Sequence, residues 1–313
     1  MTDTEQNEAK RPLIIYHGGC RDGFCAAWVC HLALKEREPE FFAGYYGQLP
    51  PICVGRDVVI VDFSYPLEVM HAIATTASSL LVLDHHKTAQ AALAELAANP
   101  PPNTKIVFDM EQSGAGLAWS HYFQCYDETG GDPLTPLERP YLVDYTEDRD
   151  LWRHALPDSK VINAYLSTLP FTFEAWSEAF TTSQQDIVEC MGDRTRWARQ
   201  QGASVEAKTK QYVAEVRKNA MVIEFEGYAG IPIVNAPQVD ISELLHAMCI
   251  GDETHAGPTF AMGWWQRADG LFQYSLRSVG NFDVSALAKK CGGGGHKNAA
   301  GFESHNLLHT RLP

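Results

Sequence analysis

Residues 79–86 read SLLVLDHH, an apolar run that ends in an aspartate and two adjacent histidines. The apolar part has the composition of a buried strand, whereas Asp84, His85 and His86 suit neither a strand interior nor an ordinary surface turn. A carboxylate beside two imidazoles can bind a divalent cation. In the alternative interpretation, one imidazole bonds a backbone carbonyl and the other is solvated. Similar side chains delivered to the same place by other segments would favour the cation.

Three other apolar runs have the character of strands: LIIY at 13–16, DVVIVDF at 57–63 and KIVFD at 105–109. Each of the four runs precedes a stretch of helical length and spacing, and the last of these helices has Ser113 as its candidate N-cap. Strands that alternate with helices form parallel sheets with helices on their faces. The sequence therefore predicts an α/β fold with a parallel sheet in its N-terminal part.

Polar side chains follow three of these strands. His17 and Asp22 come after the first strand, Asp62 ends the second, and the Asp-His-His triplet ends the third. The carboxyl ends of parallel strands lie at one edge of a sheet, where ligands bind. Taken singly, His17 is typical of a surface loop and Asp62 of a turn or a helix N-cap. Their convergence with the triplet predicts a ligand site at this edge.

The remainder of the chain changes character twice. Residues 139–218 are predicted to be mostly helical, and EDRDLW at 147–152 places Asp148 and Asp150 on either side of Arg149, where a helix-end salt bridge is the competing interpretation. After residue 220, short strands with tight turns and two helices predict a second, smaller α/β domain. We predict the following division: a domain at 12–192, a helical linker at 193–219 and a C-terminal domain at 220–313.

A run of four glycines lies in the C-terminal domain, in CGGGGHKNAAGF at 291–302. Successive glycines expose backbone N–H groups that can bind phosphate, and His296 would add charge. Arg277, in the preceding strand, could supply a planar fork to the same anion. A flexible linker is the alternative, but a linker would not separate a helix from an apolar segment.

Composition limits the kind of protein. The chain has 313 residues, a net charge of −14 and a pI near 5.3, which argues against binding along long nucleic acids through a basic groove. No apolar stretch approaches the roughly 18 residues of a membrane span, and the polar N-terminus does not resemble a signal peptide. We therefore expect a cytoplasmic protein without a membrane partner. None of the eight cysteines forms a Cys-x-x-Cys pair.

Five motifs together resemble the DHH phosphoesterase superfamily: YHGGCRDGFCAAW, VVIVDFSYP, LVLDHH, EDRDLW and GGGGHKNAAGF. Their order and spacing are similar to the branch that carries the DHH-associated C-terminal domain, which contains RecJ-type exonucleases and nano-RNases. The resemblance extends from about residue 13 to residue 302. It implies an N-terminal catalytic domain with one or two Mn²⁺ ions and a C-terminal domain that binds the substrate, with Mg²⁺, Co²⁺ or Zn²⁺ as alternative ions.

The resemblance also implies roles for individual residues. It suggests as metal ligands His17, Asp22, Asp62, His85 and Asp148, with Cys20 and Asp150 as further candidates. It places His86 near the scissile phosphate, with Asp84 orienting its neighbours. It assigns the substrate's phosphate to Arg277, Gly293, Gly294, Gly295 and His296.

Cys20 is a departure from the family pattern. Many members have an aspartate at this position, in Asp-x-Asp-Gly, whereas this chain has Cys-x-Asp-Gly. A thiolate is softer than a carboxylate and is less suited to Mn²⁺. We therefore expect the second metal position to be weaker, to use Cys20, or to fill only when substrate is present.

The resemblance implies a hydrolase that degrades short oligonucleotides or dinucleotides to 5′-mononucleotides. Cyclic dinucleotides and adenosine 3′,5′-bisphosphate are alternative substrates within the family. From another functional class, a nucleotide-binding sensor without turnover is the competing hypothesis. The sequence does not decide whether the substrate is RNA or DNA. It also leaves the oligomeric state open, with a homodimer as one alternative.

Overall fold

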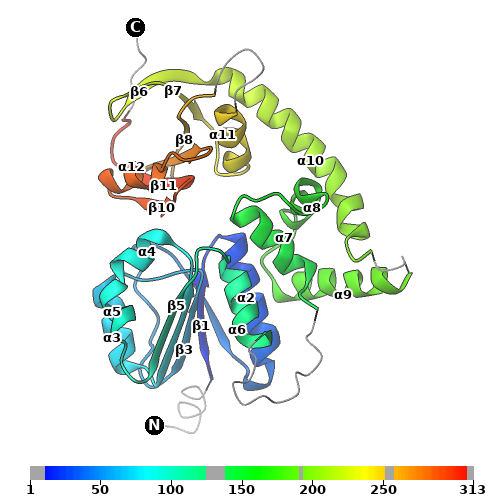
Figure 1. The fold of residues 1–313 in the computed structure, drawn as a ribbon, viewed down its shortest axis with the longest axis vertical. Coiled ribbons are helices and arrows are strands. Elements are labelled where there is room, and N and C mark those ends of the chain that lie inside the picture. Colours follow the sequence, from blue (N-terminus) through cyan, green and yellow to red (C-terminus); the bar gives the residue numbers. More distant parts are fainter. Residues whose placement is uncertain (1–10, 125–137, 190–192, 251–256, 309–313) are drawn as a thin grey trace. The chain divides into compact units, whose positions relative to one another are not determined.

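The computed structural model describes residues 11–124, 138–189, 193–250 and 257–308. The chain divides into two compact units, Met1–Glu206 and Ala207–Pro313, and the division falls inside one helix, α10 (Arg196–Val216). Each unit is described by itself below (Figure 1). Within the described ranges, no helix is both long and apolar enough to cross a membrane.

The first unit is built on a parallel sheet of five strands with the order β2-β1-β3-β4-β5. The strands are β1 (Leu13–His17), β2 (Glu40–Gly44), β3 (Asp57–Val61), β4 (Ser79–Asp84) and β5 (Thr104–Phe108). The central strands are apolar on both faces, as expected for a sheet that is covered on both sides. The predicted α/β class with a parallel sheet is confirmed.

Helices cover both faces of this sheet (Figure 1). One face carries α3 (Leu67–Thr76), α4 (Lys87–Ala92) and α5 (Ala94–Ala98), and the other carries α2 (Arg21–Leu34) and α6 (Gly114–Phe123). Ser113 accepts a hydrogen bond from the Gly116 N–H, which confirms it as the N-cap of α6. The described part of the unit also contains α7 (Tyr141–Asp150), α8 (Ser159–Leu166), α9 (Phe173–Glu189) and the first half of α10. A short 3₁₀ helix, Lys35–Arg37, follows α2.

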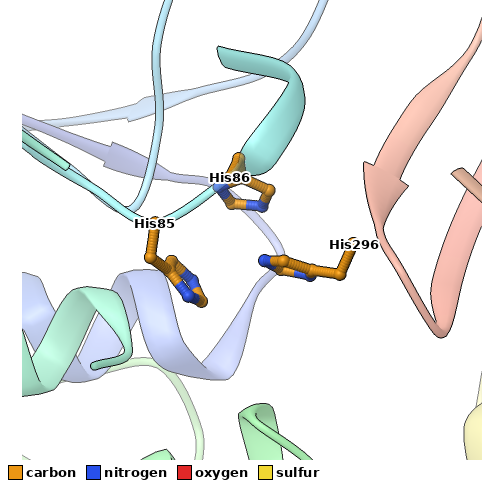
Figure 2. A group of neighbouring side chains, drawn as sticks. All are labelled: His85, His86 and His296. Atoms are coloured by element: carbon orange, nitrogen blue, oxygen red, sulfur yellow. The ribbon is translucent and has the colours of Figure 1, made fainter. Parts of the chain in front are cut away.

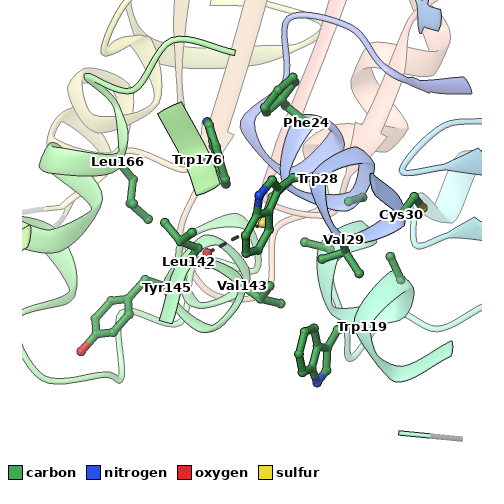
Figure 3. Packing of buried hydrophobic residues seen from close by; sticks show 14 of the residues in the cluster. Phe24, Trp28, Val29, Cys30, Trp119, Leu142, Val143, Tyr145, Leu166 and Trp176 are labelled. Atoms are coloured by element: carbon green, nitrogen blue, oxygen red, sulfur yellow. Dashed lines mark hydrogen bonds between the residues drawn. The ribbon is translucent and has the colours of Figure 1, made fainter. Parts of the chain in front are cut away.

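The larger core of the first unit joins α2 and α6 to the helices that follow them (Figure 3). Trp28 and Trp176 are fully buried there, and the Trp28 indole N–H donates to the Ser177 hydroxyl over 3.1 Å. Phe24 stacks on Phe173, with ring centroids 5.2 Å apart. Aromatic burial of this kind fixes α2, and therefore the loop before it, against the sheet.

Two local features differ from the expectation. The sequence did not indicate β2, which is an edge strand with its first residue exposed. The strand predicted at 57–63 ends at Val61, because Asp62 has a φ of 53° and cannot continue an extended ladder. The chain therefore turns at Asp62 itself.

The second unit contains a six-stranded sheet with the order β10-β11-β9-β8-β7-β6, in which only β7 and β8 run parallel. Its strands are β6 (Met221–Phe225), β7 (Tyr228–Asn235), β8 (Phe260–Gln266), β9 (Phe272–Ser278), β10 (Gly294–His296) and β11 (Ala299–Ser304). The helices are α11 (Ile241–Cys249) and α12 (Val284–Lys290), and the 3₁₀ turn Arg217–Asn219 follows α10. The strands and both helices predicted after residue 220 are present.

The glycine run forms a hairpin rather than a linker. Gly293 donates its N–H to the Ala288 carbonyl at the end of α12. A Cβ on Gly293 would lie 2.1 Å from the Gly301 carbonyl oxygen, and one on Gly295 would lie 2.6 Å from the Ala299 oxygen. Close strand approach therefore requires glycine at both positions.

Candidate metal centre

The carboxyl ends of β1, β3 and β4 bring the predicted polar side chains together. His17 is the last residue of β1, Asp62 follows β3, and Asp84 is the last residue of β4. Figure 2 shows the imidazoles of His85 and His86 between the end of β4 and the start of α4; it also draws His296, which belongs to β10 of the second unit. The carboxylates of Asp62 and Asp84 are at most 1% exposed.

Asp62 lies at the middle of the cluster. Its Oδ1 is 3.0 Å from His85 Nε2, and its Oδ2 is 3.4 Å from His17 Nδ1. Burial alone would raise the pKa of Asp62, but the neighbouring imidazoles of His17 and His85 hold it well below the ordinary value. Asp62 is therefore ionised, with each oxygen directed at a different imidazole.

The start of α6 holds Asp22. Gly114 and Ala115 donate their N–H groups to its two carboxylate oxygens, over 2.6 and 3.0 Å. A Cβ on Gly114 would lie 2.4 Å from the Asp62 Cβ, so only glycine allows α6 to start this close to the centre. Burial raises the pKa of Asp22 well above its usual value, and the charges of Asp62 and Asp150 add to that effect.

Asp84 orients the two histidines that follow it through hydrogen bonds. Its Oδ1 accepts the backbone N–H groups of His85 and His86 and lies 2.7 Å from His86 Nδ1, while Ser64 donates its hydroxyl to Oδ2. Burial would raise the pKa of Asp84, but the charge and hydrogen bond of His86 and the bond from Ser64 lower it. Asp84 thus positions its neighbours while its own oxygens are occupied.

The structure places Asp148 and Asp150 differently. Asp148 accepts the Ala155 N–H and the Ser159 hydroxyl, so its two oxygens are directed at the turn after α7 and at the start of α8. Asp150, the further candidate, has Oδ2 3.5 Å from His85 Nε2. The geometry therefore brings Asp150, and not the predicted Asp148, into the cluster.

The potential ligand atoms form three groups within the described part of the first unit, each with its atoms within 4.8 Å of one another. The oxygen-rich set comprises Asp22, His85 and Asp150. The sulfur-containing set comprises His17, Cys20 and Asp62. Asp84 and His86 form a third group with Asp62, on the side described above.

The donors fit a divalent cation. Asp62 Oδ2, Asp150 Oδ2 and His17 Nδ1 are buried and have no hydrogen-bond partner among the described residues. Buried polar atoms without partners are rare, because each carries a desolvation penalty. Burial opposes a charge on His85, yet the carboxylates of Asp62, Asp150 and Asp22 raise its pKa to about 10. A cation would replace protons in neutralising this excess of carboxylates.

Two tyrosines beside the centre were not indicated by the sequence analysis. Tyr46 is 60% exposed, and its ring centroid lies 5.4 Å from that of His17 and 5.1 Å from that of the buried Phe63. The Tyr45 ring lies directly over Gly18, in the loop after β1. A Cβ on Gly18 would come within 2.5 Å of this ring. Both tyrosines directly follow β2, and because the sequence did not indicate this strand, it gave no signal for their position.

In the second unit, the sheet register places Arg277 and His296 in one row. Both are paired with Ala299 of β11, Arg277 from β9 and His296 from β10. Residues opposite each other in an antiparallel pair share a face of the sheet, so these two side chains flank a small alanine on one face. Arg277 donates to the Ser242 hydroxyl over 2.7 Å. The Gly293 N–H is bonded to Ala288, and Gly294 and Gly295 pair with Gly301 and Ala300 of β11, so the phosphate-binding role of these glycines stays a prediction.

Comparisons with known proteins place this fold. No family model matches the chain. The uncharacterized protein R106 of Acanthamoeba polyphaga mimivirus is 27% identical over 319 residues, which cover 94% of this chain and 68% of that protein. Among solved structures, the DHH domain of PF0399, which belongs to a family of ribosomal proteins, has a TM-score of 0.51 at 15% identity, covering 94% of this chain and 83% of that one. The chain is a DHH-fold protein.

The resemblance that the motifs suggested is thus confirmed at the level of the fold. A second solved structure, exonuclease RecJ bound to manganese, matches this DHH-fold protein with a TM-score of 0.46 at 16% identity, covering 95% of this chain and 87% of that one. The ligand and substrate roles of individual residues in the DHH-fold protein stay predictions.

Proposed function

We propose that this DHH-fold protein is a metal-dependent phosphodiesterase that hydrolyses short oligonucleotides or dinucleotides to 5′-mononucleotides. The observation that carries the proposal is the cluster of carboxylates and imidazoles at the carboxyl edge of the parallel sheet, in which buried atoms of Asp62, Asp150 and His17 face one another or His85 but make no hydrogen bond among the described residues. Such a mixture of oxygen and nitrogen donors suits Mn²⁺, whereas closed structural sites favour several cysteines.

The chemistry of phosphodiester hydrolysis fits these residues. Bound divalent cations lower the pKa of a water molecule and stabilise charge on the phosphoryl oxygens. Asp62 would hold the cations, with its two oxygens directed at the two sets of donors. His86 would donate a proton to the leaving oxygen, since Asp84 fixes its Nδ1 and favours the protonated ring. Burial opposes that charge on His86, but Asp84 raises its pKa above the ordinary value.

Tyr46 supports a substrate that carries a nucleobase. Its ring is held by His17 and Phe63 at the border of the metal centre while more than half of its surface is exposed. Exposed aromatic rings stack on bases regardless of sequence, at about 1–3 kcal/mol per base. Inorganic polyphosphate has no base on which Tyr46 could stack, so this tyrosine favours a nucleotide substrate over polyphosphate. The net charge of −14 further favours a short substrate over a long nucleic acid.

Product analysis with a substrate panel tests the proposal. The full chain would be incubated with Mn²⁺ and, separately, a dinucleotide, a longer RNA, a cyclic dinucleotide, adenosine 3′,5′-bisphosphate and tripolyphosphate. We expect 5′-mononucleotides from the dinucleotide at the highest rate. Release of inorganic phosphate from the bisphosphate alone would identify a phosphatase instead. Saturable dinucleotide binding without any product would identify the nucleotide sensor.

A further inference from the structure

Cys20 does not behave as a structural residue at its position. It is the N-cap of α2, yet its side chain makes no capping hydrogen bond. Serine or aspartate there would stabilise the helix by accepting a backbone N–H of its first turn. Cys25 and Cys30 of the same helix are fully buried among apolar side chains, whereas Cys20 is partly exposed. The thiol receives at most a weak bond from the Gly23 N–H and is not part of the apolar core, so this cysteine is open to another role.

The surroundings of Cys20 contain two potential metal-ligand atoms that face each other but make no hydrogen bond among the described residues. Asp62 is 1% exposed, and its Oδ2 has no hydrogen bond within the part of the chain that the structure describes. His17 Nδ1 has none either and lies 3.4 Å from that oxygen. The thiol belongs to the same group, since the ligand atoms of the sulfur-containing set all lie within 4.8 Å of one another. One sulfur, one nitrogen and one oxygen atom are therefore gathered around one position.

The two sets of donors differ in chemical hardness. The oxygen-rich set offers two carboxylates and one imidazole, which suit Mn²⁺ or Mg²⁺. The sulfur-containing set offers a thiolate, an imidazole and a carboxylate, and thiolates favour borderline ions such as Zn²⁺ and Co²⁺ over Mn²⁺. Because Asp62 directs one oxygen at each set, both positions could be filled at once.

We propose that the centre is a mixed-metal site, in which the sulfur-containing set binds Zn²⁺ or a similar borderline ion through the Cys20 sulfur and the oxygen-rich set binds Mn²⁺. This inference rests on the proposed function, because it assigns the ions of the same centre. When the sulfur–metal bond forms, the S–H bond breaks and the thiol proton leaves to solvent. No oxidation or reduction is involved.

Cobalt spectroscopy tests the sulfur–metal bond without measuring activity. The full chain would be stripped of metal with a chelator and titrated with Co²⁺ in the presence of a phosphine reductant, while near-ultraviolet absorbance is recorded. A thiolate bound to Co²⁺ gives a charge-transfer band. We expect this band in the unaltered protein, its loss in Cys20→Ser, and its retention in Cys291→Ser. Cys291 is the matched control, since it is also partly exposed but lies in the second unit.

Competitive loading tests ion preference at the two positions. The stripped protein would be incubated with one equivalent of Zn²⁺ per chain and an excess of Mn²⁺, because oxygen and nitrogen donors also bind Zn²⁺ more tightly than Mn²⁺, and the retained ions measured by elemental analysis. We expect about equal amounts of both ions in the unaltered chain. Cys20→Asp replaces the soft ligand with a hard one, and we expect it to retain less Zn²⁺ and more Mn²⁺. Aspartate is a good N-cap residue, so α2 can start normally in Cys20→Asp. A changed ion content in this variant would therefore not come from loss of the first turn of the helix.

Each outcome separates this inference from the proposed function. Co²⁺ binding without the band, or a band that survives Cys20→Ser, overturns the mixed-metal site while leaving phosphodiester hydrolysis intact. Equal ion content in the unaltered chain and Cys20→Asp would also overturn it. Loss of hydrolysis with the band still present would contradict the proposed function alone.

Discussion

At the scale of single residues, most of the candidate site could be predicted because its members lie next to strand ends. His17, Asp62 and His85 needed only the rule that the carboxyl ends of parallel strands meet at one edge. The choice between Asp148 and Asp150 could not be made in this way. Residues two apart on a helix point about 200° apart, so the choice requires the rotation of α7 about its axis. That rotation is set by packing against α8, α6 and α2.

Asp62 provides the sharpest test at this scale. Asn tolerates the positive φ of 53° and keeps the side-chain shape, so Asp62→Asn removes the charge with little effect on the backbone. We expect hydrolysis of a dinucleotide in Mn²⁺ to fall at least about 10²-fold, as for other single catalytic groups. Asp57→Asn is the control, since Asp57 lies at the opposite end of the same strand. Comparable rates in the two variants would contradict the role of Asp62.

Tyr46 offers a test of base recognition. Tyr46→Ala should raise the KM for a dinucleotide by about 5- to 150-fold, which corresponds to a loss of about 1–3 kcal/mol of stacking. Tyr46→Phe keeps the ring and should retain the KM. Leu49→Ala is a control from the same loop, because Leu49 is 81% exposed but has no aromatic face. An unchanged KM in Tyr46→Ala would exclude stacking at this ring.

At the scale of elements, the sequence indicated four of the five parallel strands and the helices that cover them. It missed β2, since an edge strand is defined by pairing with β1 and not by its own apolar pattern. It also could not give the register that aligns Arg277 and His296 beside Ala299. Register depends on contacts between segments far apart in the chain.

The packing of α10 on α8 leads to a stability prediction. A Cβ on Gly202 would lie 1.9 Å from the Val161 carbonyl oxygen, which is backbone and cannot rotate away. Gly202→Ala should therefore destabilise the first unit by about 1–3 kcal/mol of overpacking, against the roughly 1 kcal/mol that alanine adds to helix propensity. Ser204→Ala, at an exposed position of the same helix, should have little effect. Thermal unfolding followed by circular dichroism measures both, and a higher midpoint for Gly202→Ala would refute the close contact.

At the scale of the whole molecule, the metal centre couples ligand binding to folding. Carboxylates buried together repel one another unless a cation or protons neutralise them. Saturating Mn²⁺ should stabilise the native state by about 2.7 kcal/mol at 100 times the dissociation constant. The unfolding temperature should therefore rise with Mn²⁺ and fall with a chelator, and the shift should shrink in Asp62→Asn. A shift of equal size in that variant would place the ion elsewhere.

The second unit gives a prediction that separates binding from chemistry. If His296 holds a phosphate remote from the reacting bond, His296→Ala should raise KM and leave kcat nearly unchanged. Lys218→Ala serves as a control, because Lys218 is exposed and pairs with Glu215 nearby in sequence. Steady-state kinetics on a dinucleotide gives both constants. A collapse of kcat at constant KM would instead indicate proton transfer by His296.

The boundary between the two units limits where the chain can be divided into separate fragments. Because the division at Glu206 and Ala207 falls in the interior of α10, a gene fragment that encodes either half would end in a severed helix with unpaired backbone groups. Recombination that exchanged one half alone would have to rejoin that helix in the correct rotational phase. Transfer of the whole gene avoids this requirement.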